Sequence, residues 1–493
     1  MATTRTNNVT TENLVRQSTL HVFCIGGSGL RILRSLIMLL ASGYDIKGYK
    51  IKPYLVDPHL QSKELSEVSD LIAKYHKLYY GTNNGFFKTP IEADINNLNV
   101  MTSTNVNDKS FGTFIGSQAC QTGSPESMLI EMLYSKKNIE TSMSVGFKGS
   151  PNVGSVVFQD FVNSKWFSSF QPAQNDRVIL VGSLFGGTGA SGIPAIADAI
   201  KKKSAATKVG VIALIPYFAL GEPAENSQHR EINSEIFDIK SFAALKYYAD
   251  NANSFDRFYV FGDTEKKVYN YDEESQGNDA HIIELAASQA FKDFAEEQDT
   301  DLTPSTRWNQ IVIDTNKPTL NYDDCGEGLK TAVSCLSDFY SFSKVFFLMQ
   351  RETFYPFYRG YKGVLDTEDF KTLNDFIYEE DPQKYSFIRF MGELHDNKRA
   401  FNAIDTRDII SPENDVQLDH YRFVPSARFH LLNRDRNGAD GTRVISSQFV
   451  KINDSYRRSL KKQEEITPVS AFLNAAQEGI REVNVKQYTA NLK

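Results

Sequence analysis

Two short apolar runs in the first half of the chain each lead into a glycine-rich loop and then into a helical pattern. HVFCI (residues 21–25) is followed by GGSG and LRILRSLIMLLAS, and RVILV (residues 177–181) is followed by GSLFGGTGASGIP and AIADAIKKK. Short buried strands that alternate with helices are typical of a parallel sheet, because parallel neighbours need a crossover connection. The sequence therefore predicts an α/β fold with glycine loops at the carboxyl ends of the strands, where such sheets bind ligands.

The same patterns divide the chain into segments. Further strand patterns follow in YKIKPYLVD, which ends on Asp57, in KVGVIALIPYF and in DRFYVFG. The region between Asp57 and Gly146 is polar and irregular, which indicates an insertion. The expected organisation is a flexible arm (1–18), a first α/β domain (19–270, with an insertion at about 61–145), a long central helix (271–300), a second α+β domain (301–460) and a C-terminal helical tail (461–493).

Composition and charge exclude several classes of protein. The 493 residues carry a net charge of −7 with no long Lys/Arg block, so no nucleic-acid partner is expected. The most apolar window, residues 32–41, contains Arg34 and is about half as long as a membrane span, so no membrane partner is expected. Residues 1–18 lack the apolar core of a signal peptide. The four scattered cysteines form no C-x-x-C pair, which favours a reducing, cytoplasmic location over a zinc site.

The glycine loops match neither of the two common phosphate-binding motifs. Gly27, Ser28 and Gly29 could begin the dinucleotide motif G-x-G-x-x-G, but Ile32 occupies the third glycine position. The phosphate loop G-x-x-x-x-G-K-[ST] does not occur, since no lysine follows the glycines of residues 182–194. A nicotinamide-dependent oxidoreductase is therefore a weak alternative, and the loops indicate another kind of site.

Taken together, three loops resemble the tubulin/FtsZ family of GTP-binding filament proteins. IGGSGLR (25–31) follows the first strand, GFKGSPNVG (146–154) precedes a helix, and GGTGASGIP (186–194) follows the next strand. The family has a glycine loop, G-A-G-x-N-P-x-V-G and G-G-G-T-G-[ST]-G in the same order. The resemblance covers about residues 19–345 and is closest to a divergent bacterial or phage tubulin-like GTPase. It implies a Rossmann-like GTPase domain, a long central helix and a second α+β domain.

The resemblance also implies a site for GTP or GDP, with Mg²⁺ held through the nucleotide phosphates and water. Glycines let successive N–H groups face an anion, and the helix after each loop presents its positive end. The alternative is that GGTGASGIP is an ordinary glycine-rich turn. The implied phosphate contacts are Gly26, Gly27, Ser28, Gly29 and Arg31 in the first loop, Gly149 and Ser150 in the second, and Gly186, Gly187, Thr188, Gly189, Ala190 and Ser191 in the third.

Other residues would hold the base and the ribose. In the family the central helix starts beside the guanine base, and Asn278 occupies this place, with Gln276 and His281 as neighbours. Asp57 would face the ribose or the Mg²⁺, and Glu222 stands one place later than the family's ribose-binding glutamate. Each of these residues could instead cap a helix or a turn. The residues alone do not decide between guanine and adenine.

The segment PTLNYDDCGEG (318–328) resembles the family's N-x-D-x-x-D loop, which enters the nucleotide pocket of the next subunit. Asn321 and Asp323 match its first two positions, whereas the third falls on Gly326 and Asp324 stands two places early. A carboxylate here would orient the water that attacks the γ-phosphate. The alternative is an acidic turn that caps the next helix.

Such a loop makes hydrolysis depend on assembly of identical subunits. A head-to-tail contact between unlike faces repeats without closing, so we expect filaments. The alternative is a protein that binds nucleotide without hydrolysing it and serves as a scaffold or sensor. With either function, the insertion and the C-terminal tail are the expected places for an unidentified protein partner.

Overall fold

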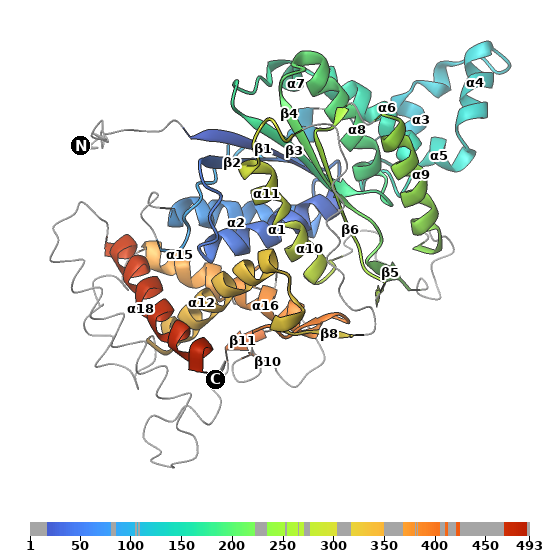
Figure 1. Cartoon of the computed structure of the whole chain (residues 1–493). Coiled ribbons are helices and arrows are strands. Elements are labelled where there is room, and N and C mark those ends of the chain that lie inside the picture. The colour runs from blue at the N-terminus through green and yellow to red at the C-terminus, as the bar shows by residue number, and fades with distance from the viewer. Residues whose placement is uncertain are drawn as a thin grey trace, which may run out of the picture.

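A five-stranded parallel sheet forms the centre of the protein in this computed structural model (Figure 1). The structure describes residues 17–490 except 80–84, 104–105, 107–108, 222–233, 252–253, 265, 271–276, 303–316, 350–367, 380, 382, 405–409, 413–420 and 424–467. The sheet order is β2-β1-β3-β4-β6, built from β1 (Ser18–Ile25), β2 (Tyr49–Val56), β3 (Arg177–Ser183), β4 (Lys208–Leu214) and β6 (Arg257–Phe261). All neighbours are parallel, so the predicted α/β class and parallel sheet are confirmed. The winding direction changes between β1 and β3, which is where such sheets open a ligand crevice.

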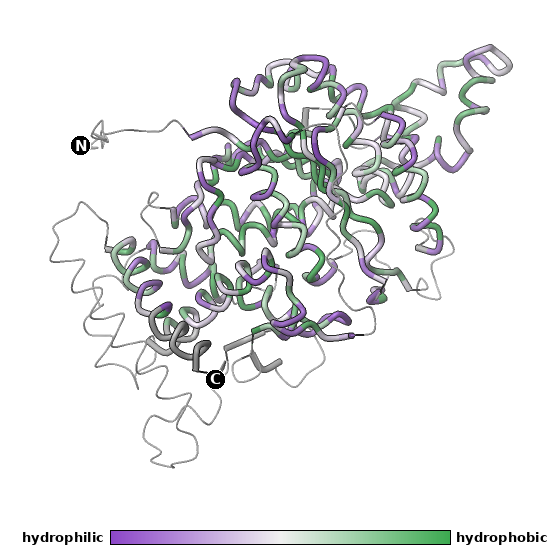
Figure 2. The backbone as a smooth tube through the Cα atoms, in the orientation of Figure 1, coloured by the Kyte–Doolittle hydropathy of each residue, from purple (hydrophilic) through white to green (hydrophobic). Residues whose placement is uncertain are grey.

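Helices cover both faces of this sheet (Figure 1). One face carries α1 (Gly26–Ala41), α2 (Lys63–Leu78), α10 (Ile282–Ala287) and α11 (Ala290–Glu296). The other carries α6 (Pro151–Val162), α7 (Lys165–Ser169), α8 (Thr188–Lys203) and α9 (Phe237–Asp250). Side chains of β1 alternate between the two cores, Val22 and Cys24 in the first and Phe23 and Ile25 in the second. Figure 2 accordingly shows hydrophobic residues throughout the central strands.

α8 begins earlier than the sequence indicates, at Thr188 rather than after Pro194. A proline inside a helix has no N–H to donate to the carbonyl four residues before it. That carbonyl belongs to Ala190, and it accepts a hydrogen bond of 2.9 Å from the Tyr248 hydroxyl of α9 instead. Residues 188–191 therefore form a helical turn rather than a loop, and α9 is attached to that turn.

The prediction of a long central helix over residues 271–300 is wrong for the described part of that range, 277–300. α10 begins only after His281, whose Nδ1 accepts a hydrogen bond from the N–H of Ile283, and it ends at Ala287. The Ser288 hydroxyl then lies 2.9 Å from the carbonyl oxygen of Glu284 and 3.4 Å from that of Ile32 in α1. A serine that donates to the carbonyl four residues before it weakens the helical ladder. The chain accordingly breaks into two short helices.

The C-terminal half adds helices to the core on the α1 face. Phe339, Phe376, Phe387 and Phe472 join the same hydrophobic cluster as α1. They belong to α12 (Glu327–Met349), α15 (Glu368–Ile377), α16 (Phe387–Asp396) and α18 (Pro468–Ala490). Short strands pair outside the main sheet: β5 (Phe218–Leu220) with β7 (Lys267–Tyr269), β8 (Thr319–Leu320) with β9 (Ala400–Phe401), and β10 (Ile410–Pro412) with β11 (Tyr421–Phe423). Much of the expected second α+β domain, including residues 303–316, 350–367 and 424–460, lies outside the described residues.

The helix α18, within the segment expected as a C-terminal tail, closes over the far end of α1. Its inner side chains, among them Phe472 and Leu473, are buried. Gln477 lies so close to Gly43 and Gly85 that a Cβ atom on either glycine would come within 2.6 Å of its side chain. Segments from opposite ends of the chain therefore complete one core.

The segment expected as an insertion, residues 61–145, contains two different parts. α2 packs against α1, while Ile91 and Asn99 form isolated parallel bridges with β2. Farther along, α3 (Phe111–Phe114), α4 (Pro125–Leu133) and α5 (Lys136–Glu140) project from the body (Figure 1). Among the helices of the described residues, none is long and apolar enough to cross a membrane.

Candidate functional site

Three glycine loops meet at the carboxyl ends of β1 and β3: the first loop (residues 26–29), the second loop (146–150) and the third loop (184–187). A Cβ atom placed on Gly26 would lie 3.2 Å from the Cβ of Thr188, and one on Gly146 would lie 3.8 Å from the Thr188 hydroxyl. A Cβ atom on Gly187 would lie 3.0 Å from the backbone nitrogen of Ser150. The loops that resemble the family's motifs are therefore neighbours in space, at the point where the sheet changes direction.

The helices that leave these loops have no side-chain N-cap. α1 follows Ile25, α6 follows Ser150 and α8 follows Gly187, and in none of the three does the capping side chain accept a hydrogen bond from the first turn. Serine side chains cap six other helices of the described chain: α2, α3, α4, α5, α7 and α16. The first N–H groups of a helix need an acceptor, and the helix dipole favours a negative one. Three such ends at one place suit a bound anion.

Two glycines allow the helices to start this close to the strands. A Cβ atom on Gly29 would lie 2.6 Å from the carbonyl oxygen of Val181 in β3. One on Gly189 would lie 2.5 Å from the carbonyl oxygen of Ser183. These oxygens belong to sheet backbone and cannot rotate away, so a larger residue would push the helix off the strand. The glycines of the motifs therefore have a packing role as well as a proposed binding role.

Two acidic side chains lie on the β2 side of the loops. The carboxyl carbon of Glu64, in α2, is 3.9 Å from a Cβ atom placed on Gly27. Asp57 follows β2 directly, is buried, and accepts a hydrogen bond of 2.9 Å from the N–H of His59. Burial, helped by the Glu64 carboxylate, raises the pKa of Asp57 to about 7. Carboxylate oxygens suit Mg²⁺, and the sequence reasoning missed Glu64 because no motif marks it.

We expect Asp57→Asn to stabilise the nucleotide-free protein at about pH 8.5 and to have little effect near pH 4. The folded pKa of about 7 lies above the usual value of an unfolded aspartate. The stabilisation from the bound proton is thus complete below the unfolded pKa and is lost as the pH rises through 7. The uncharged amide avoids that loss, which is on the order of 4 kcal/mol at about 1.4 kcal/mol per tenfold change in proton affinity. Urea unfolding of the wild type and of Asp57→Asn at both pH values measures the difference in stability. A difference that does not depend on pH would contradict the prediction.

Arg31, expected at the phosphates, is buried in a network below the first loop. Its Nε donates to Glu284 at 2.8 Å and its Nη2 donates to the Tyr217 hydroxyl at 2.8 Å. The Tyr217 hydroxyl donates to the same Glu284 oxygen at 2.6 Å. Nη2 is also 3.4 Å from the hydroxyl of Ser28. The guanidinium therefore fastens α10 to α1 and touches the first loop through Ser28.

The residues expected at the base lie at the start of α10, on the α1 face. Asn278 is buried, and its backbone carbonyl accepts a hydrogen bond of 3.4 Å from Arg34. His281 is buried beside Tyr217, with ring centroids 5.1 Å apart. Burial lowers the pKa of His281 to about 4, so its imidazole is neutral at pH 7. Glu222 and Gln276 lie outside the described residues.

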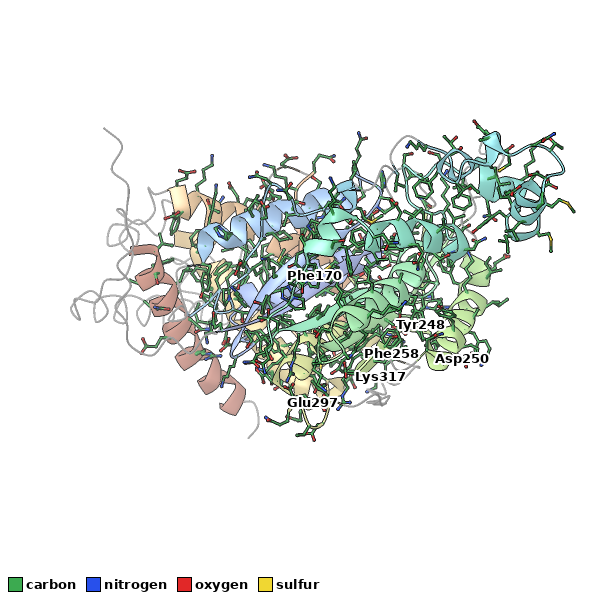
Figure 3. All side chains as sticks on the ribbon, turned by 90° about the horizontal axis from the view of Figure 1, so that it is seen from above. Phe170, Tyr248, Asp250, Phe258, Glu297 and Lys317 are labelled. Atoms are coloured by element: carbon green, nitrogen blue, oxygen red, sulfur yellow. The ribbon has the colours of Figure 1, made fainter. Side chains whose placement is uncertain are left out.

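α9 forms a wall of the site that the sequence reasoning missed. Phe237, at its start, packs on Phe185 of the third loop with ring centroids 4.7 Å apart. Tyr248, farther along α9, packs on Phe258 of β6 with ring centroids 5.8 Å apart (Figure 3). Between these anchors, the Lys240 ammonium donates a hydrogen bond of 2.7 Å to the Gly149 carbonyl in the second loop. The sequence shows only a lysine in a helical pattern, and no local signal places it here.

The acidic segment expected to be catalytic lies apart from the loops within one chain. β8 leads into it in the lower half of Figure 1, whereas α6 and α8 lie at the upper right. Asn321 and Asp323 are exposed. Asp324 pairs with Lys317 at 2.6 Å and accepts a hydrogen bond of 2.9 Å from the N–H of Asn321. The hydrogen bond from Lys317 lowers the pKa of Asp324, so its carboxylate is ionised and engaged.

Neither a metal-binding cluster in the described residues nor a match to a family model or a curated protein identifies the site. In the part of the chain that the structure describes, no three His, Cys, Asp or Glu side chains are grouped to hold a metal ion. No protein-family model matches the chain, and no curated protein matches it either. A proposal about function therefore rests on the geometry of the three loops.

Proposed function

We propose that the chain is a divergent tubulin/FtsZ-type protein that binds GTP in the three loops. One observation carries the proposal: the N-termini of α1, α6 and α8 converge without side-chain caps beside the switch point of a parallel sheet. A polyphosphate supplies the acceptors that these helix ends need. The resemblance of the loops to the family's sequence patterns supports the same function independently.

The residues around the loops fit a nucleoside triphosphate with Mg²⁺. The backbone N–H groups of the first turns of α1, α6 and α8 would hold the phosphates. Asp57 and Glu64, on the β2 side, would hold Mg²⁺ through water, and the metal would neutralise charge on the phosphates. Asn278, in the segment that leads into α10, would meet the edge of the base.

We further propose that GTP is hydrolysed where two copies meet. The Asp323 carboxylate is exposed and lies on another part of the chain from the loops, so a second copy would deliver it. There it would orient the attacking water. The contact joins unlike faces and repeats head-to-tail, which gives filaments in the cytoplasm.

The nucleotide carried by the purified protein tests the binding proposal. We expect the denatured full chain to release one guanine nucleotide per chain, identified by chromatography, since a tightly bound nucleotide stabilises the fold and survives purification. The variant Gly187→Val is the control, because its side chain would fill the gap between the second and third loops. Protein that carries no nucleotide and does not bind added GTP with Mg²⁺ would contradict the proposal, and a released dinucleotide would favour an oxidoreductase.

A second function, nucleotide binding without hydrolysis, is favoured by the engagement of Asp324. Its carboxylate is held by Lys317 and by the N–H of Asn321, which leaves Asp323 as the available acid of the segment. In this case the protein would serve as a scaffold or sensor for a partner. Stoichiometric GTP binding with no phosphate release at any protein concentration would support it over the GTPase.

A further inference from the structure

We infer that Lys240 of α9 contacts the last phosphate of a bound nucleoside triphosphate, so that the site prefers triphosphate over diphosphate. The inference rests on the nucleotide site proposed above. It adds a cationic side chain from α9 to loops that lack the lysine of the phosphate-loop motif G-x-x-x-x-G-K-[ST].

Contacts on both sides of Lys240 hold it at the second loop. Before it, Phe237 is buried against Phe185 of the third loop. After it, the Tyr248 hydroxyl is bonded to Ala190 in the first turn of α8. The Lys240 nitrogen is 2.9 Å from a Cβ atom placed on Gly149. The ammonium group is therefore held beside the second loop and does not extend into solvent.

The surroundings of the Lys240 ammonium group favour the binding of an anion. In the described part of the chain its hydrogen bond goes to the neutral Gly149 carbonyl, and no carboxylate pairs with it. Burial lowers the pKa of Lys240, and the positive charge of Lys137 lowers it further. A half-buried cation beside a second cation is unfavourable until an anion joins them. An ammonium group has three N–H donors, so two remain for phosphate oxygens.

The position of Lys240 indicates which phosphate of the nucleotide it would contact, namely the last one. Asn278, proposed at the base, lies beside Arg34 on the α1 face of the sheet, whereas the second loop, where Lys240 donates to Gly149, leads into α6 on the opposite face (Figure 1). A nucleotide that starts at Asn278 and crosses the ends of β1 and β3 reaches the second loop with its terminal phosphate. A diphosphate would end before Lys240.

Nucleotide affinities of Lys240→Met in the full chain test the inference. Dissociation constants for GDP and for a non-hydrolysable GTP analogue are measured by titration of fluorescent nucleotides. We expect the affinity for the triphosphate to fall by about 10- to 100-fold, as for loss of a charged hydrogen bond, and the affinity for GDP to stay within about threefold. Lys240→Arg should retain most of the triphosphate affinity.

Lys246→Met is the matched control. Lys246 lies on the same helix, is exposed, and pairs with Asp250 at its end, labelled in Figure 3. Both affinities of this variant should equal those of the wild type. If Lys240→Met fails to fold, Lys240→Gln gives the same readout, because its amide can still donate to Gly149.

Each outcome supports or overturns the inference. A Lys240→Met variant that binds the triphosphate as tightly as the wild type overturns it and leaves the nucleotide site intact. Equal losses for triphosphate and diphosphate also overturn it, since they would mean that Lys240 only supports the second loop. Wild-type protein that binds neither nucleotide overturns the proposed function and this inference together.

Discussion

On the proposed function, we expect replacing Asp323 with alanine to lower the rate of GTP hydrolysis by at least about 100-fold and to leave the affinity for GTP within about threefold of the wild type. Asp323 is exposed, so it is free to enter the pocket of a second copy. A carboxylate that orients water acts in the transition state and adds little to binding. Phosphate release measured over a range of protein concentrations gives the rate. Wild-type activity per chain should rise with concentration, because the proposed site is completed only by a second copy.

Two comparisons make this prediction specific. Glu327→Ala removes a nearby exposed acid that pairs with Lys330, and it should leave turnover unchanged. Mixing Asp323→Ala with Gly187→Val should restore part of the activity, because one variant keeps intact loops and the other keeps the acid. Mixtures as inactive as their components would contradict a shared site, and full activity of Asp323→Ala alone would exclude its proposed role.

Gly29→Ala lowers the free energy of unfolding by about 3 kcal/mol. Its Cβ atom would lie 2.6 Å from the carbonyl oxygen of Val181 and 3.0 Å from the carbonyl carbon of Cys24, both in sheet backbone. The start of α1 must therefore move away from β1 and β3. The midpoint of urea unfolding without nucleotide measures the change.

Gly326→Ala provides the control for this substitution. A Cβ atom on Gly326 meets no heavy atom within 4 Å, so the free energy of unfolding should change by less than about 0.5 kcal/mol. If the two variants unfold at the same urea concentration, α1 does not begin as close to β3 as the structure places it.

The strands were predictable, and the exact extent of two helices was not, for physical reasons. A strand buried on both faces reads as a continuous apolar run, as RVILV does. The start of α8 depends on the Tyr248 hydroxyl, which donates a hydrogen bond to the carbonyl of Ala190, 58 residues away. The end of α10 depends on Ser288, which contacts α1. Such long-range hydrogen bonds leave no mark in a local pattern.

The candidate site shows the same division between local and tertiary information. The glycine loops are visible in the sequence because the backbone must approach other backbone at Gly29 and Gly189. Lys240 and Glu64 reach the loops only through the packing of α9 and α2, and neither belongs to a motif. Arg31 does belong to the first motif, yet its guanidinium is bound by Glu284 and Tyr217.

The contact between Gln477 and the glycines Gly43 and Gly85 has a consequence for biosynthesis. The ribosome adds about 5–20 residues per second, so roughly 20–80 s pass between the synthesis of Gly85 and that of Gln477. During this time the sheet and α1 can form, but the side of the core that α18 covers stays open to water. The nascent chain therefore exposes apolar surface for most of its synthesis, and chaperones that bind such surfaces should associate with it until α18 emerges.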